Sequence, residues 1–108
     1  MKKMLGLMVR RSDMSPDEFR KYWNTTHAEI TAKVPGLRSY VQNMCLPDEN
    51  GDPPYDGVAV LGWDNDESMA ESLATPEWAA VMDDVPKFVD TDRAIIMIAE
   101  DNVVVGTR

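Results

Sequence analysis

Met4-Leu5-Gly6-Leu7-Met8-Val9 is an unbroken apolar run between Lys2-Lys3 and Arg10-Arg11, and it is a strong indication of the fold. A strand with one solvated face alternates apolar and polar residues, so a run that is apolar at every position predicts a strand buried on both faces. Residues 57–63 and 94–99 form two further runs of this kind. Three such strands in a short chain indicate that a sheet forms the centre of the protein.

The segment that follows the first strand carries a strong helix start. Ser15 can cap the helix, Pro16 suits its first turn, and Glu18 can complete a capping box with Ser15. We expect this helix to end before Pro35-Gly36, because proline disfavours a helical conformation in the residue before it. Its apolar side is one stripe with Tyr22 beside it: Phe19, Trp23, Ile30 and Val34.

The rest of the chain predicts three more strands and a second helical region. The expected elements are strands at 37–46, 57–63 and 94–99, an acidic loop at 47–56, and helical segments at 64–74 and 75–85. Residues 103–105, three valines, could add an edge pairing. The order β-α-β-β-α-β predicts an α+β, ferredoxin-like fold with a four-stranded antiparallel sheet, in a single domain over residues 1–108.

The expected sheet has more apolar surface than its helices can cover. Two helices cover only one face of a four-stranded sheet, whereas the strands at residues 4–9, 57–63 and 94–99 are apolar on both faces. Soluble monomers avoid a large exposed apolar face. We therefore expect a homodimer in which two sheets pack face to face around a shared core, a dimeric α+β barrel.

The chain is acidic, which argues against some classes of partner. It has 11 basic and 19 acidic residues, a net charge of −8. Nucleic acids and anionic membrane surfaces bind cationic proteins, so we expect neither as a partner. The charge is uneven, since residues 1–38 carry +4 and residues 39–108 carry −12. Such a split could steer an anion or orient a partner, or it could be an ordinary solvated surface.

Other features limit the chemistry and the compartment. The single cysteine, Cys45, cannot form an internal disulfide, and no apolar run approaches the ~20 residues of a membrane span. These two features predict a cytoplasmic protein. One histidine is too few for the usual histidine metal triads, and no glycine-rich phosphate loop occurs. We expect neither a metal nor another cofactor.

Three polar residues are candidates for chemistry. His27, the only histidine, lies on the apolar stripe of the first helix. It is either a core residue or a general acid–base, because its ordinary pKa is close to neutral pH. Tyr40 could relay a proton or hold an oxyanion, and Asn43 could donate a hydrogen bond to one. In a regular strand, however, Tyr40 and Asn43 lie on opposite faces.

Cationic and aromatic residues are candidates for ligand binding. One of Arg10, Arg11 and Arg38 could bind a carboxylate or phenolate, although surface arginines often pair with a nearby acid instead. The tryptophans indicate a core, or they could form an aromatic wall for a flat ligand. They are Trp23, Trp63 and Trp78.

Five motifs extend along nearly the whole chain. In order they are Arg10-Arg11-x-Asp13-Met14-Ser15-x-Asp17-Glu18-Phe19-x-x-Tyr22-Trp23-x-x-x-His27-Ala28, Pro35-Gly36-Leu37-Arg38-x-Tyr40-Val41-Gln42-Asn43, Pro54-Tyr55-Asp56-Gly57-Val58-Ala59, Thr75-Pro76-Glu77-Trp78 and Phe88-Val89-Asp90. Together they resemble the EthD family. The resemblance implies a dimeric α+β barrel that acts in small-molecule catabolism, with an oxidoreductase label given by association and not by mechanism.

A more distant resemblance points to two residues. Methylmuconolactone methylisomerase, a cofactor-free enzyme of aromatic catabolism, has a comparable histidine followed by Pro-Gly-Leu-x-x-Tyr. This resemblance implies that His27 and Tyr40 are the catalytic pair. The chain departs from the expected family pattern at Val60, where an acidic residue would follow Val58-Ala59. A carboxylate that serves chemistry in relatives would therefore be missing here.

We consider three functions. The first is cofactor-free proton transfer, of an isomerase, dehydratase or lyase type, on a small aromatic or lactone-like metabolite, in which His27 moves a proton and Tyr40 assists. The second is a non-catalytic carrier or accessory protein that supports an oxygenase partner. The third is a cofactor-free oxygenase that acts on a phenolic substrate. The candidate substrate-binding residues are Trp23, Arg10, Arg38, Asn43 and Trp63.

Overall fold

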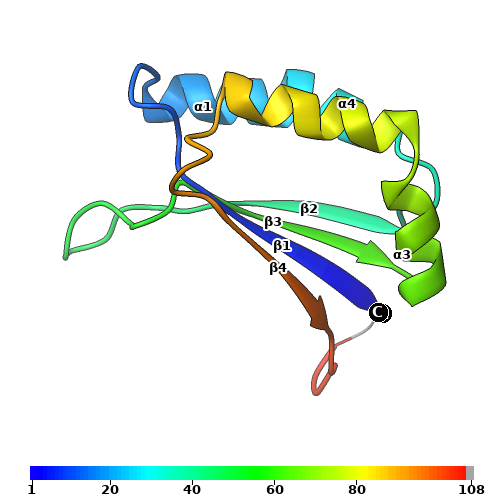
Figure 1. The fold of residues 1–108 in the computed structure, drawn as a ribbon. Coiled ribbons are helices and arrows are strands. Elements are labelled where there is room, and N and C mark those ends of the chain that lie inside the picture. The colour runs from blue at the N-terminus through cyan, green and yellow to red at the C-terminus, as the bar shows by residue number, and fades with distance from the viewer. Residues whose placement is uncertain (107–108) are drawn as a thin grey trace.

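A computed structural model describes residues 1–106 of the chain. Its strands form one antiparallel sheet in the order β2-β3-β1-β4 (Figure 1). They are β1 (Lys2–Met8), β2 (Ser39–Met44), β3 (Gly57–Trp63) and β4 (Ile95–Glu100). The helical segments are α1 (Pro16–Tyr22), the π-helical η1 (Trp23–His27), α2 (Ala28–Thr31), α3 (Asp66–Leu73), α4 (Pro76–Asp84) and the 3₁₀-helical η2 (Val85–Lys87). The α+β, ferredoxin-like fold predicted from the sequence is confirmed.

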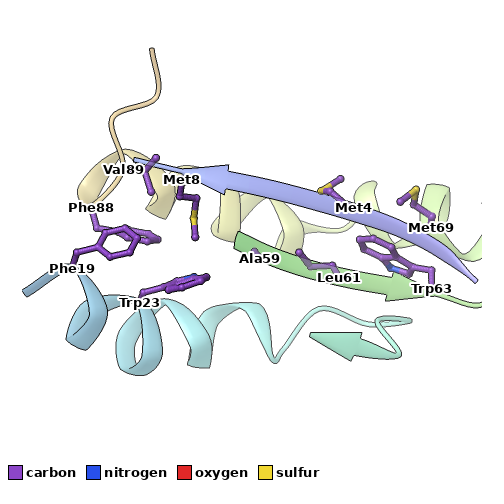
Figure 2. Close-up of a cluster of buried hydrophobic side chains, with 10 residues drawn as sticks. All are labelled: Met4, Met8, Phe19, Trp23, Ala59, Leu61, Trp63, Met69, Phe88 and Val89. Carbon is purple, nitrogen blue, oxygen red and sulfur yellow. The ribbon is translucent and has the colours of Figure 1, made fainter. Parts of the chain in front are cut away.

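The helices lie on one face of the sheet, and the core fills the space between the two layers (Figure 1). Alternate strand residues point toward the helices, among them Met4 and its partner Leu61. Figure 2 shows the core in two groups along this layer, with Phe19, Trp23 and Phe88 at one end and Trp63 at the other. No helix among residues 1–106 is long and apolar enough to cross a membrane.

The opposite face of the sheet is apolar and has no helix over it. The strand residues that point away from the helices form this face. Among them, Val41 on β2 and Met97 on β4 keep 52% and 45% of their surfaces exposed. Leu5 on β1 and Val60 on β3 pair with these strands and belong to the same face. The excess of apolar strand surface expected from the sequence therefore exists, and we call it the open face.

Helix caps form as the sequence predicts. The Ser15 hydroxyl accepts the backbone N–H of Glu18 at 3.1 Å, and the Glu18 carboxylate accepts the N–H of Ser15 at 2.9 Å. The Thr75 hydroxyl accepts the N–H of Trp78 at 3.2 Å, which begins α4 where a restart was expected.

Several element boundaries differ from those predicted. The strand expected at 4–9 is shifted to Lys2–Met8, and the one expected at 37–46 is shorter, because Gly36 turns with a φ of +83° and Leu37 packs on the core. The first helix ends near Thr31. The Val34 N–H donates to the Thr31 carbonyl, which forms a tighter, three-residue turn before Pro35. The predicted edge pairing at 103–105 is wrong, since β4 pairs with β1 as far as Glu100 opposite Lys2 and the chain then runs past the end of the sheet.

Candidate functional site

A mostly apolar cavity of about 80 Å³ lies between the sheet and the helices. Sheet residues such as Ala59 and Leu61 form one wall, and Val81 of α4 contributes to the other. Its rim includes Met82 and Ile96, which are both exposed, so the cavity opens between α4 and β4. The side chains that bring polar atoms or aromatic rings to the lining are His27, Thr31, Tyr40, Trp23 and Trp78.

A π-helical turn supplies two of these side chains. The segment Trp23–His27 winds with one extra residue per turn, and the Ala28 N–H accordingly reaches back to the Trp23 carbonyl. Both Trp23 and His27 are buried, at 0% and 5% exposure. Short π-turns within α-helices occur frequently at functional sites, because they reorient side chains that a regular helix would place elsewhere. The sequence pattern predicted a regular helix here.

His27 forms a buried pair with Asp84 of α4. The distance between His27 Nδ1 and Asp84 Oδ2 is 2.8 Å, and the Asp84 side chain is 3% exposed. Hydrogen bonds from Tyr22 and His27 keep the pKa of Asp84 below its ordinary value despite burial, so its carboxylate is an acceptor only. The proton of the neutral imidazole must therefore be on Nδ1, and Nε2 carries the free lone pair.

Burial controls the protonation state of His27. It lowers the pKa of the imidazole, while the nearby Asp84 carboxylate opposes that shift and does not cancel it. The neutral form is thus the resting form at neutral pH. A neutral imidazole that is oriented by a carboxylate at Nδ1 can accept a proton at Nε2.

Asp84 has two further partners on its other oxygen. The Tyr22 hydroxyl donates to Asp84 Oδ1 at 2.7 Å, and Lys87 Nζ lies 3.6 Å from the same atom. Burial and the carboxylate together raise the pKa of Tyr22 to about 12. Phe88 packs between the two rings, with centroid distances of 5.2 Å to Tyr22 and 4.7 Å to His27.

Tyr40 reaches the cavity from β2 on the helix-facing side of the sheet. Gln42 Nε2 donates to the Tyr40 hydroxyl oxygen at 2.9 Å and to the Trp23 carbonyl at 2.8 Å. The carbonyl accepts only, which fixes the orientation of the Gln42 amide. Burial raises the pKa of Tyr40, and the Gln42 hydrogen bond opposes this without cancelling it, so the phenol keeps its proton. The phenol is therefore a hydrogen-bond donor, and the side chains of Thr31 and Trp23 also lie near its oxygen.

The remaining predicted binding residues lie outside the cavity. Arg10 Nη1 pairs with Asp56 at 3.0 Å, and the exposed Arg38 has Nε 3.5 Å from Asp64. Asn43 faces the opposite side of the sheet from Tyr40, as the strand periodicity predicts, and donates to the Val58 carbonyl.

Trp63 belongs to the core beside the cavity. Its ring stacks edge-on against Trp78 at a centroid distance of 6.2 Å, and Trp78 lines the cavity. The buried indole N–H groups of Trp23 and Trp63 have no hydrogen-bond partner among residues 1–106. Of the seven predicted site residues, the cavity therefore brings together His27, Tyr40 and Trp23.

Asp84 and Tyr22 were not assigned to the site from the sequence, although a signal existed. Asp84 lies three residues after Val81 and one before Val85, on the apolar stripe of its helix. An acid at that position faces the core, and it also lies at the carboxyl end of α4, where the helix dipole disfavours a negative charge. An acid on the apolar side of a helix predicts a buried partner, which here is His27.

No group of three or more potential metal ligands occurs within the described part of the chain. The chemistry that these residues can perform is proton transfer, with His27 Nε2 as the base and the Tyr40 hydroxyl as a hydrogen-bond donor. Both atoms belong to side chains of a cavity whose walls are otherwise mainly apolar, where such polar interactions are stronger than in water.

Comparisons with known proteins agree with this fold. The EthD domain family matches residues 11–92. An ethyl tert-butyl ether D (EthD) family protein from Bacillus halodurans is 26% identical with a TM-score of 0.82, covering 94% of this chain and 99% of that one. A dimeric ferredoxin-like protein of unknown function from Thermobifida fusca is 16% identical with a TM-score of 0.69, covering 91% and 88%.

A third solved structure has a stated activity. SnoaB, a cofactor-independent oxygenase from Streptomyces nogalater, is 16% identical with a TM-score of 0.63, covering 96% of this chain and 97% of that one. At this identity the likeness shows the fold alone. The chain matches no curated protein.

Proposed function

Because the chain belongs to the EthD family, whose sequence match spans most of its length, we propose that it catalyses proton transfer without a cofactor on a small metabolite bound in the cavity. One observation carries the proposal: the buried 2.8 Å hydrogen bond between His27 Nδ1 and Asp84, which leaves Nε2 as a base on the side chain that lines the cavity. The reaction class is isomerisation, with dehydration or related elimination as close variants.

The mechanism uses two side chains. His27 Nε2 removes a proton from carbon beside a carbonyl group, and the C–H electron pair moves to form an enolate. The Tyr40 hydroxyl donates to the carbonyl oxygen and stabilises the negative charge that develops there. The imidazolium, stabilised by Asp84, then returns the proton to the same or a conjugated carbon, so atoms and charge balance and no redox partner is required.

The lining of the cavity favours an uncharged substrate. No Lys or Arg among residues 1–106 lines it, since Arg10 and Arg38 are held by Asp56 and Asp64 elsewhere. A carboxylate in this cavity would lose its hydration without gaining a cation, which is costly. We therefore infer a neutral, one-ring aromatic or lactone-like molecule, part of which extends through the rim between α4 and β4.

We propose that the open face pairs with a second copy of the chain. Val41, Ile95 and Met97 keep between 42% and 52% of their surface exposed on this face. Structural relatives from Thermobifida fusca and Bacteroides fragilis are described as dimeric. A homodimer would bury this surface and leave the cavity on the outer, helical side of each sheet.

The experiment uses α-angelica lactone, a neutral five-membered lactone whose double bond migrates into conjugation when one proton moves. Proton NMR in D₂O follows the isomerisation and the entry of deuterium at carbon. We expect His27→Ala to lower the protein-catalysed rate about 100-fold or more and Tyr40→Phe to lower it less, as general-base catalysis contributes about 10²–10⁴. Tyr55→Phe, a matched tyrosine change in the acidic loop, should have no effect. A rate that His27→Ala leaves unchanged contradicts the mechanism.

The two alternatives give different results in parallel measurements. A carrier or accessory protein would bind neutral aromatic molecules equally well in wild type and His27→Ala, with no catalysed exchange. An oxygenase, the activity of the structurally similar SnoaB, would consume dissolved oxygen with a phenolic substrate, and an oxygen electrode detects this. A cytoplasmic location and a role in catabolism stay predictions.

A further inference from the structure

Asp84 of α4 contacts three other helical segments through one carboxylate. Its Oδ2 accepts the Nδ1–H of His27 at 2.8 Å, and its Oδ1 accepts the hydroxyl of Tyr22 at 2.7 Å. Lys87 Nζ lies 3.6 Å from the same Oδ1. Tyr22 does not line the cavity, so its hydroxyl has no direct contact with a ligand there. The mechanism described above gives it no role.

We propose that Tyr22 is a positioning residue that sets the base strength of His27 through Asp84. This inference rests on the proposed function, because it concerns the same histidine. A carboxylate that accepts a strong hydrogen bond at one oxygen has less negative charge to offer at the other, since both oxygens share one delocalised charge. Tyr22 therefore weakens the hold of Asp84 on an imidazolium and favours the neutral imidazole, whose Nε2 can act as a base.

The other groups around this pair come from η2, β2 and the aromatic core. Lys87, on η2, is a cation on the Tyr22 side of Asp84 and acts in the same direction as Tyr22. Tyr40, on β2, lines the same cavity as His27 and is uncharged, because burial raises its pKa. Phe88 fills the space between the Tyr22 and His27 rings. Within residues 1–106, Tyr22 and Lys87 are thus the groups that compete with His27 for the carboxylate.

The test is a proton NMR titration of the His27 ring in the whole chain, and the single histidine makes the assignment unambiguous. Tyr22→Phe removes the hydroxyl and keeps the ring against Phe88. It should raise the midpoint of the His27 titration by about 0.5 pH unit, which corresponds to a fraction of the free energy of one hydrogen bond to a charged group. Lys87→Met, at a side chain that is 68% exposed, should raise it too. Tyr55→Phe is the matched control and should leave it unchanged.

Asp84→Asn shows whether the effect passes through the carboxylate. In that background Tyr22→Phe should no longer shift the His27 midpoint, as a double-mutant cycle requires. The proposal is overturned if Tyr22→Phe leaves the midpoint unchanged or lowers it, or if the upward shift persists without the Asp84 charge. If Tyr22→Phe does not fold, Tyr22→Leu, which also lacks the hydroxyl group, decides by the same criteria.

The titration is independent of turnover. It requires no substrate, so a chain that fails to isomerise any lactone can still show the coupling between Tyr22 and His27. Conversely, an active enzyme whose His27 midpoint ignores Tyr22 would retain the proposed function and lose this inference. For an active enzyme, the acidic limb of the pH–rate profile should move to higher pH in Tyr22→Phe, by the same amount as the NMR midpoint.

Discussion

Replacing Gly57 with alanine tests the packing behind the cavity wall. Gly57 lies in β3, and a Cβ at this position would come within 2.6 Å of Cζ3 and 2.8 Å of Cη2 of Trp23. Ordinary contacts begin near 3.4 Å, so the atoms would overlap by about 0.8 Å. Trp23 is a rigid ring with 0% exposure, so it cannot move into solvent. Either β3 or the π-turn that carries Trp23 has to shift.

The expected cost follows from this overlap. Forcing an extra methyl group into a well-packed core destabilises proteins by about 1–3 kcal/mol. In a domain of this size each kcal/mol lowers Tm by roughly 4–8 °C, so Gly57→Ala should melt at least about 4 °C below wild type. Trp23 also lines the cavity, and the same change should therefore weaken the binding of a ligand there.

Circular dichroism melts at one fixed protein concentration measure the effect, since association would make Tm depend on concentration. Gly6→Ala is the matched control, because Gly6 lies on β1 and its Cβ would sit 3.8 Å from Ala59 Cβ, an ordinary contact. Its φ is not positive, so alanine should be neutral or stabilise by up to about 1 kcal/mol. A Gly57→Ala protein as stable as Gly6→Ala would refute the packing argument.

Three further predictions concern pH, a helix cap and assembly. Burial lowers the pKa of His27 in the folded chain, so the unfolded chain binds the extra proton, and stability should fall as pH drops below about 6.5, by at most about 1.4 kcal/mol per pH unit. Urea titrations from pH 7.5 to 5 should show a shallower loss in His27→Asn, and equal slopes would contradict this. Ser15→Ala should lower the free energy of unfolding in urea by about 1 kcal/mol, because it removes the N-cap acceptor of the Glu18 N–H. An unchanged free energy would mean that the cap contributes nothing. Sedimentation should give a dimer mass at micromolar concentration and a monomer mass for Met97→Asp on the open face, whereas a wild-type monomer would exclude the pairing.

The sequence predicted those parts of the fold that depend on local patterns. The three runs that are apolar on both faces of the strand correspond to β1, β3 and β4. The Ser15–Glu18 capping box begins α1. Boundaries were less accurate where tertiary contacts set them. The valines at 103–105 favour strand locally, but β4 ends at Glu100 opposite Lys2, and these valines pair with no strand within residues 1–106.

The candidate site was predicted in part. His27 and Tyr40 were chosen from the sequence and its family resemblance, and both line the cavity. Arg10 could equally have been a ligand-binding residue, and only the position of Asp56 shows that its guanidinium is engaged elsewhere. Asp84 is 57 residues from His27 along the chain, so no local spacing relates the two.

Periodicity, capping residues and turn residues act over a few positions, and the sequence therefore fixes the order of strands and helices and leaves one sheet face without a helix. The protonation state of His27 depends on contacts between segments that are far apart in the sequence. Its tautomer and lowered pKa arise because α4 packs beside the π-turn and brings Asp84 into contact, while the surrounding core removes water. Both properties come from contacts between residues that are far apart in the sequence, so they follow from tertiary packing and not from any local pattern.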